Sequence, residues 1–302
     1  MVRTVFKTML AALAALSMTA AQAFHVFACE PEWAALVKAL MPQATVFSAT
    51  HVAQDPHHIE ARPALIAQLR RASLAVCTGA SLEAGWLPML QQRAGNAAVQ
   101  DGQPGMFYAT DHVALMDAVQ GTVGAFAGDV HVEGNPHVHA DPYRLMKVAQ
   151  ALRQRLAQLQ PDQAQAIDAR HRQFEASLRA KISAWEQRAA PIRGREIVGQ
   201  HTSLRYLWAW LGLQQVADLE PKPGMPPTPG HLDKTLAQLK TRPAMAIVVA
   251  LHQDPRAGKW LSSQLGPSMP LLLLPATVTD DGEDALFQWY ERLVSALVQS
   301  AR

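Results

Sequence analysis

The sequence comprises 302 residues, of which 49% are hydrophobic and 17% are charged, enough apolar side chains for one large or two ordinary folded domains. A formal net charge of only +2, with no long run of lysine and arginine, argues against a nucleic-acid-binding protein. Two cysteines exclude a dense disulfide framework, a four-thiolate zinc site and a cysteine-ligated iron–sulfur cluster within one chain. Twelve histidines against four tyrosines remain to be explained.

The first residues have the pattern of an export signal. Residues 1–7 carry two positive charges, residues 8–20 are mostly small and apolar, and Ala21-Gln22-Ala23 forms an A-x-A cleavage pattern. We therefore expect a cleavable signal peptide over residues 1–23 and a periplasmic mature protein. The apolar stretch is shorter than the roughly 20 residues of a membrane span, so we expect the protein not to be membrane-inserted.

The next part of the chain alternates between short apolar runs and longer amphipathic stretches. Such alternation predicts βαβ units around a parallel sheet, and we assign residues 24–160 to an N-terminal α/β lobe. The expected strands are 24–29, 44–50 and 73–79, and the expected helices are 31–41, 62–71 and 82–93.

Cys29 and Cys77 each end one of these apolar runs. If the two runs are neighbouring parallel strands, their sulfurs lie at the same edge of the sheet. In an oxidising compartment the two cysteines would then form a disulfide, and the alternative is a pair of buried free thiols.

A long helix is predicted in the middle of the chain. Residues 143–160 already show a helical apolar repeat, and residues 162–189 contain neither glycine nor proline. At ~1.5 Å per residue the second stretch spans roughly 42 Å, enough to cross a whole molecule. We expect residues 161–189 to form one rigid connecting helix.

The strand and helix alternation resumes after this helix. Strands are expected at 196–200, 244–251 and 269–276, helices at 203–211 and 284–299, and a proline-rich loop at 220–230. The predicted fold is thus α/β with two lobes, each a mostly parallel sheet flanked by helices, joined by one long helix. The C-terminal lobe would comprise residues 190–302.

Three histidine-bearing motifs stand at junctions of this fold. One is Asp55-Pro56-His57-His58-Ile59-Glu60 after the second strand, another is Gly134-Asn135-Pro136-His137-Val138-His139, and the third is His201 directly after a strand. Ligands of open α/β sheets bind beyond the carboxyl ends of the strands, so the three motifs would converge if the lobes face each other.

Three imidazoles suit Zn²⁺, a borderline-soft ion that takes four ligands. Asp55 and Glu60 lie near enough in sequence to accept hydrogen bonds from a ligating imidazole. Any one of these histidines, taken alone, is equally consistent with a polar loop residue, because neither H-E-x-x-H nor another helical ligand spacing is present.

At these residues the sequence resembles the zinc/manganese-type solute-binding proteins of ABC importers, the two-lobed group with a single long connecting helix. The similar segments extend over nearly the whole predicted mature chain. They are DPHHIE (55–60), GNPHVHADP (134–142), GQHTSLRYLWAWLGL (199–213), LEPKPGMPPTPGHL (219–232) and LPATVTDDGEDALF (274–287).

The resemblance implies that His57 and His137 of the N-terminal lobe and His201 of the C-terminal lobe ligate the metal. Histidine at the third position favours zinc over manganese. Family members commonly supply a fourth ligand, an aspartate, after the last strand, where this sequence has Leu274-Pro275-Ala276-Thr277-Val278. We therefore expect Asp280 in that role, with Asp281 or water as alternatives. His139 would be an outer-layer or surface residue.

The function implied is capture of Zn²⁺ in a cleft between the lobes and its delivery to the membrane permease of an ABC importer. Such a protein binds and releases its ion without catalysis, and we expect a monomer. Two alternatives use the same histidines: a periplasmic zinc buffer or chaperone, and a secreted zinc hydrolase with water as fourth ligand and Glu60 as general base.

Overall fold

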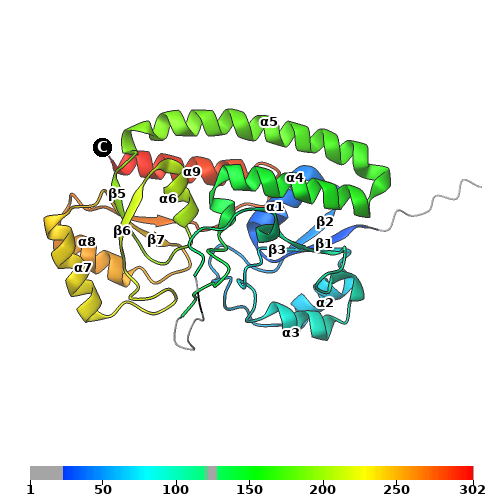
Figure 1. Ribbon diagram of the computed structural model, residues 1–302, viewed down its shortest axis with the longest axis horizontal. Helices are drawn as coiled ribbons and strands as arrows, with labels where there is room; N and C mark the ends of the chain where they lie inside the picture. The colour runs from blue at the N-terminus through cyan, green and yellow to red at the C-terminus, as the bar shows by residue number, and fades with distance from the viewer. Residues whose placement is uncertain (1–22, 120, 122–127, 302) are drawn as a thin grey trace, which may run out of the picture.

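The computed structural model of the protein describes residues 23–119, 121 and 128–301. Two α/β lobes lie side by side, and one long helix runs along both of them (Figure 1). Except for Ala23, the predicted signal peptide lies outside the described residues. Within the described ranges, no helix is both long enough and apolar enough to cross a bilayer.

The N-terminal lobe is built on a four-stranded parallel sheet with the order β2-β1-β3-β4. Its three longer strands confirm the predicted ones, whereas the three-residue edge strand β4 was not predicted. The strands are β1 (His25–Ala28), β2 (Thr45–Ser48), β3 (Leu74–Cys77) and β4 (Met106–Tyr108), and the helices are α1 (Pro31–Leu40), α2 (Pro63–Arg71), α3 (Leu87–Ala94) and α4 (Pro142–Leu159).

The C-terminal lobe repeats this plan with the strand order β6-β5-β7-β8, again all parallel. One strand and two helices, β6, α7 and α8, were not predicted. The strands are β5 (Glu196–Gly199), β6 (Gln214–Asp218), β7 (Ile247–Ala250) and β8 (Leu271–Leu274), and the helices are α6 (Arg205–Leu211), α7 (Pro229–Thr241), α8 (Arg256–Leu265) and α9 (Ala285–Ser300).

The predicted long helix is α5 (Ala164–Ala189). It packs on α1 and α4 of the first lobe and on α9 of the second. Its apolar stripe belongs to a buried cluster that continues through both lobes, and Phe174 stacks on Phe287 with ring centroids 5.3 Å apart. Because this core is continuous, the two lobes are held in a fixed relation to each other.

Cys29 follows β1 and Cys77 ends the neighbouring parallel strand β3. The two residues are joined by a disulfide, with their Cα atoms 4.8 Å apart. The disulfide therefore links the carboxyl ends of β1 and β3. It lies close to the segment that leaves β2 towards His57, where Thr50 donates a hydrogen bond to the carbonyl of Cys29.

Candidate metal centre

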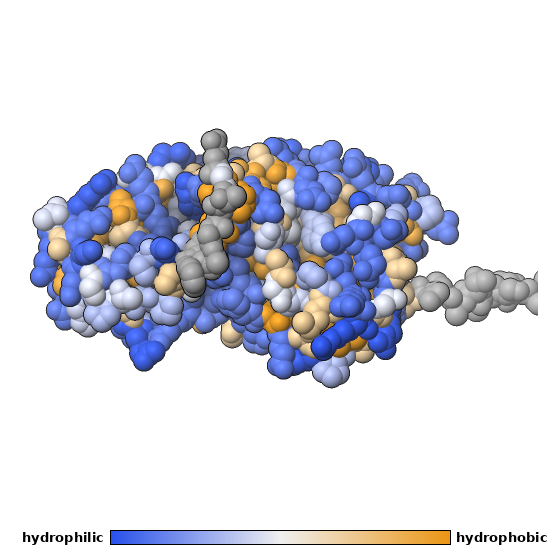
Figure 2. All heavy atoms as spheres, turned by 60° about the horizontal axis from the view of Figure 1, so that its bottom comes forward, coloured by the Kyte–Doolittle hydropathy of each residue, from blue (hydrophilic) through white to orange (hydrophobic). Residues whose placement is uncertain are grey.

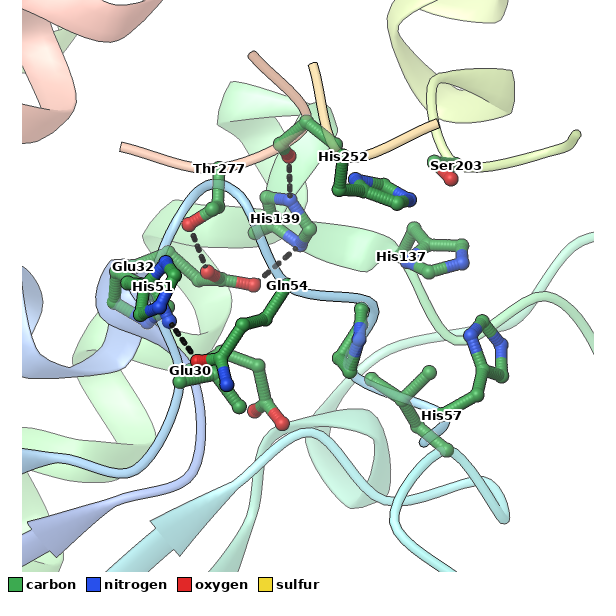
Figure 3. A pocket seen from close by; sticks show the side chains of 15 residues that line it. Glu30, Glu32, His51, Gln54, His57, His137, His139, Ser203, His252 and Thr277 are labelled. Carbon is green, nitrogen blue, oxygen red and sulfur yellow. Dashed lines mark hydrogen bonds and ion pairs between the residues drawn. The ribbon is translucent and has the colours of Figure 1, made fainter. Parts of the chain in front are cut away.

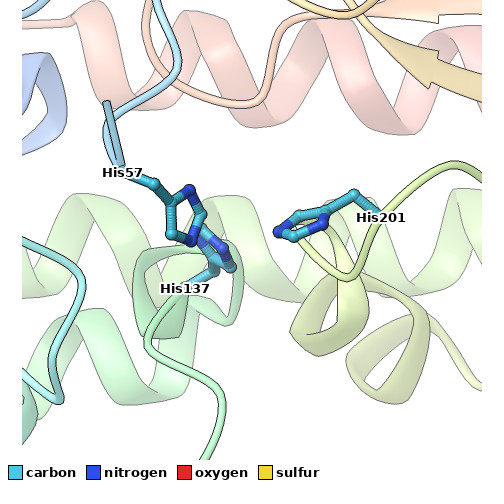
Figure 4. Close-up of side chains that lie close together, drawn as sticks. All are labelled: His57, His137 and His201. Atoms are coloured by element: carbon cyan, nitrogen blue, oxygen red, sulfur yellow. The ribbon is translucent and has the colours of Figure 1, made fainter. Parts of the chain in front are cut away.

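Three buried histidines meet at the boundary between the lobes. His57 lies in the turns that follow β2, His137 precedes the short 3₁₀ helix η3 (Val138–Ala140), and His201 follows β5. One ring nitrogen from each lies within 4.8 Å of the other two. In Figure 4 His57 and His137 lie together and His201 faces them from the other lobe. The ring centroids are 5.3–6.0 Å apart.

Asp55 sets the orientation of the His57 ring. One of its oxygens, Oδ1, accepts hydrogen bonds from the backbone N–H of His57 at 3.0 Å and from its Nδ1 at 2.7 Å. Burial acts to raise the pKa of the Asp55 carboxyl, but the hydrogen bond and charge of His57 outweigh it and the pKa is lowered. The carboxylate thus keeps the proton of His57 on Nδ1 and leaves Nε2 as the free ligand atom.

His201 is held in the same way by residues of the second lobe. Its backbone has a φ of 65°, in the left-handed region. Its N–H donates to Asp218 at 3.1 Å, and its Nδ1 donates to Glu220 Oε2 at 3.0 Å. Burial opposes the charged ring, yet Glu220 outweighs burial and raises the pKa of His201. Nε2 is again the free nitrogen.

His137 is positioned by a network that joins the lobes. Its N–H donates to Asn135 Oδ1 at 3.0 Å, and the Asn135 amide donates to the carbonyl of Thr202 at 3.0 Å. His137 Nε2 is buried and has no hydrogen-bond partner among the described residues. Burial and the neighbouring His57 lower the pKa of His137, so its ring is neutral near pH 7. A buried neutral imidazole with an unpartnered nitrogen is suited to a metal ion.

The structure does not bring Asp280 into this group, which corrects the expected ligand set. The Asp280 side chain is exposed and accepts a hydrogen bond from Thr279. Asp281 is exposed as well and pairs with Lys38 at 3.2 Å. The physical reason is the path of the chain after β8. Ala276 and Thr277 first form hydrogen bonds with the buried His139 and Glu32, and the chain then turns to the surface, which carries Asp280 away from the three rings.

Glu60 lies away from the three rings, whereas the ring of His139 adjoins that of His137, with centroids 6.3 Å apart. Glu60 is exposed. His139 is buried, but both of its ring nitrogens are occupied: Nδ1 lies 3.0 Å from Glu32 Oε1, and Nε2 donates to the carbonyl of Ala276 at 2.9 Å. His139 therefore ties the first lobe to the segment after β8. It lines a polar cavity next to His57 and His137, together with Glu30, Gln54 and His252 (Figure 3).

Three residues that were not predicted as site residues also lie at the site: Asp218, Glu220 and His131. The two carboxylates end or follow β6, a strand whose polar sequence QQVAD gave no strand signal. Recognising β6 would have placed both acids at a carboxyl strand end beside His201. His131 reaches the site from the other lobe, with its Nε2 3.2 Å from His57 Nε2.

Two parallel α/β lobes that share a long helix, with buried imidazoles from both lobes at their boundary, define a two-lobed solute-binding protein of the metal-binding type. The chain belongs to the family described as the periplasmic zinc-uptake complex component A, ZnuA, whose pattern matches residues 26–300.

Individual relatives are distant. The high-affinity zinc uptake system protein ZnuA of Yersinia pestis is 24% identical over 204 residues, which are 64% of either chain. The zinc-binding lipoprotein AdcA of Streptococcus pneumoniae serotype 4 is 22% identical over 234 residues, 76% of this chain and 46% of AdcA. The chain thus matches between about half and two thirds of the length of these curated relatives.

Solved structures show the same fold. A crystal structure of ZnuA superposes with a TM-score of 0.76 at 18% identity, covering 93% of this chain and 100% of that one. The binding protein FpvC of Pseudomonas aeruginosa, in complex with Ni²⁺, gives a TM-score of 0.73 at 18% identity, covering 93% and 97%.

Proposed function

We propose that this protein captures Zn²⁺ outside the cytoplasmic membrane and delivers it to the permease of an ABC importer. The observation that carries the proposal is the group of three buried imidazoles, His57, His137 and His201, whose ligand atoms lie within 4.8 Å of one another and come from both lobes. Membership of the periplasmic zinc-uptake family supports the same ion and the same compartment, and the names of the two curated relatives support the same ion. The cleavable signal peptide expected over residues 1–23 is part of this proposal.

The donor set favours zinc over manganese. All three ligand atoms are imidazole nitrogens, which suit zinc, whereas manganese prefers carboxylate, carbonyl and water oxygens. The two carboxylates nearest the rings, Asp55 and Glu220, are hydrogen-bonded to His57 and His201 and orient these rings. Nickel and copper compete with zinc on these grounds, because both also accept imidazole ligands.

The ligands impose a simple cycle of capture and release. The first lobe supplies two histidines and the second lobe one. All three therefore ligate the ion only when the two lobes and their loops bring these side chains together. The continuous core around α5 limits the motion to small tilts and loop shifts. Release then requires the permease to withdraw one ligand, and His201 is the single ligand on its lobe.

A zinc hydrolase fits the site less well than a binding protein does. Hydrolysis needs a general base beside the metal-bound water. The predicted base, Glu60, is exposed, and Asp55 and Glu220 are hydrogen-bonded to ligand imidazoles. We therefore propose binding and release without chemistry.

Calorimetric titration of the metal-stripped protein tests the proposal. We expect one Zn²⁺ per chain bound tightly, and Mn²⁺ bound much more weakly under the same conditions. Asp280→Ala serves as a second sample, because its side chain is exposed in the structure and the variant should bind zinc like the wild type. Failure of the wild-type protein to bind zinc would overturn the proposed function.

A growth experiment separates an importer component from a periplasmic buffer. Deletion of a zinc importer component impairs growth when zinc is scarce, and loss of a buffer mainly impairs survival when zinc is abundant. We expect the first result, restored by the wild-type gene and not by a gene encoding His201→Ala.

A further inference from the structure

A fourth histidine adjoins the group of three. His131 Nε2 lies 3.2 Å from His57 Nε2, and the two ring centroids are 5.3 Å apart. His131 is half-buried and belongs to the segment 128–134, which precedes His137 in the chain. The tight group within 4.8 Å contains only the other three histidines, so His131 stands beside it on the His57 side.

The hydrogen bonds of His131 identify its free nitrogen. Nδ1 lies 2.9 Å from the carbonyl oxygen of Ala80. A carbonyl only accepts hydrogen bonds, so Nδ1 carries the proton and Nε2 presents a lone pair. His57 and His201 have the same arrangement, with Nδ1 directed at Asp55 and Glu220.

When both rings are neutral, the contact between His57 and His131 therefore brings two nitrogen lone pairs together. Two such lone pairs repel each other, and either a proton or a metal ion between them removes the repulsion. Two ligands at ~2.0–2.1 Å from a tetrahedral zinc ion are roughly 3.3–3.4 Å apart, close to the observed separation. The pair is thus placed at the spacing of two ligands on one ion.

The backbone around His131 is built to keep it there. Ala80 and Ser81 both have positive φ, 46° and 65°, an unfavourable conformation for residues other than glycine, and this turn presents the Ala80 carbonyl to His131. Ser81 Oγ donates to Glu133 at 3.0 Å. The N–H of Asp129 donates to the carbonyl of Pro223 at 2.9 Å, which ties the segment to the second lobe.

We propose that His131 is the fourth ligand of the bound zinc ion, so that this protein holds zinc with four imidazoles in place of three imidazoles and a carboxylate. The inference rests on the proposed function, because it concerns the same ion. On binding, the His131 ring turns about its single hydrogen bond to Ala80 until Nε2 faces the ion with the other three. Four neutral nitrogen donors strengthen the preference for zinc over manganese.

Zinc affinity provides the first test. The metal-free protein and its His131→Ala and His58→Ala variants compete with a chromophoric chelator for Zn²⁺. His58 is the matched control, since its side chain is 70% exposed and lies next to a ligand. We expect His131→Ala to weaken binding by at least roughly 10–100-fold, the loss seen when only an outer partner of a ligand is removed, and His58→Ala to leave binding unchanged. Equal affinities of the wild type and His131→Ala would overturn the inference.

Cobalt spectroscopy tests contact with the ion directly, independent of any effect on folding. Co²⁺ replaces Zn²⁺, and residue 131 is changed to cysteine (His131→Cys), with His58→Cys as control. A cysteine that ligates cobalt produces a sulfur-to-metal charge-transfer band in the near ultraviolet. We expect this band in His131→Cys alone, and its absence there would overturn the inference. Failure of the wild type to bind zinc would instead refute the proposed function.

Discussion

At the scale of single residues, the site depends on which nitrogen of each ring is free. Asp55 fixes this for His57 and Glu220 fixes it for His201, through hydrogen bonds of 2.7 Å and 3.0 Å to Nδ1. Both acids therefore belong to the site, because they fix the orientation of the rings that would ligate the ion. Only Asp55 could be anticipated from the sequence, because it stands two residues from its histidine, whereas Glu220 reaches His201 across nineteen positions.

Removing the charge of Glu220 should weaken zinc binding. Glu220→Gln keeps the shape of the side chain but makes the His201 ring a poorer donor to the ion, and we expect zinc affinity to fall by roughly 10-fold or more. Competition with a chelator measures the change. Glu60→Gln, an exposed carboxylate close to His57 in the chain, is the control and should bind as the wild type does. Unaltered affinity in Glu220→Gln would contradict this role.

A pair of buried carboxyls near the disulfide should make stability depend on pH. Burial raises the pKa of Glu83 to about 7, and burial together with the charge of Glu83 raises the pKa of Glu30 well above its ordinary value. Glu83 accepts hydrogen bonds from the N–H groups of Thr78 and Gly79. Glu30 Oε1, in contrast, is buried and has no hydrogen-bond partner in the described part of the chain. We infer that Glu30 carries the proton of the pair.

The sign of the pH effect follows from these shifts. A carboxyl with a raised folded-state pKa, as Glu30 has, contributes stability that is present below its unfolded pKa of 4.5 and is lost as the pH rises above that value. Glu30→Gln supplies a permanent donor to Glu83. Between pH 5 and pH 8 we expect the variant to gain on the order of 1 kcal/mol in unfolding free energy relative to the wild type.

Urea unfolding of the two metal-free proteins at both pH values measures this difference. The exposed Glu60→Gln variant is the control, and its unfolding free energy should differ from that of the wild type by the same amount at both pH values. A difference between Glu30→Gln and the wild type that does not change with pH would show that Glu30 is not the protonated member of the pair.

At the scale of elements, the central strands could be predicted, whereas two of the four edge strands of the described sheets, β4 and β6, could not. β1, β3 and β7 are covered on both faces and therefore appear in the sequence as continuous apolar runs. The edge strands β4 and β6 are short or polar, and their pairing comes from the sheet. α8 was missed because it contains a glycine, Gly258, which is unusual inside a helix. A Cβ atom at this position would lie 2.9 Å from Leu271 Cδ1, so the glycine allows α8 to pack closely on β8.

The long helix α5 should be the element whose packing matters most to both lobes. Leu178 is fully buried in the core that the lobes share. Leu178→Ala is expected to reduce the free energy of unfolding by about 2–5 kcal/mol, the usual cost of such a cavity. Arg179→Ala, on the exposed side of the same turn, should change it by no more than ~0.5 kcal/mol. Similar losses in the two variants, measured by urea unfolding, would contradict the role assigned to α5.

At the scale of the whole molecule, the two lobes and α5 act as one packed unit. The buried cluster includes Leu36 of the first lobe, Phe174 of α5 and Tyr290 of the second lobe. The convergence of the histidines is a property of this assembly. Each could be placed at a strand end or a loop from the sequence, but Asp280 could not be excluded, because its position depends on how the segment after β8 meets the first lobe.

Zinc binding should therefore leave the overall dimensions of the protein almost unchanged. A shared core resists the wide hinge closure seen in proteins whose lobes are joined by flexible strands. Small-angle X-ray scattering of the metal-free and zinc-loaded protein should give the same radius of gyration within error. A clear decrease on adding zinc would contradict a rigid connection through α5.

The most direct test of zinc capture at the lobe boundary is an anomalous difference map from zinc-loaded crystals, with data collected on both sides of the zinc absorption edge. One strong peak is predicted per chain, bonded to Nε2 of His57, His137 and His201. A protein that binds zinc in solution but shows its anomalous peak away from these three nitrogens would contradict the account.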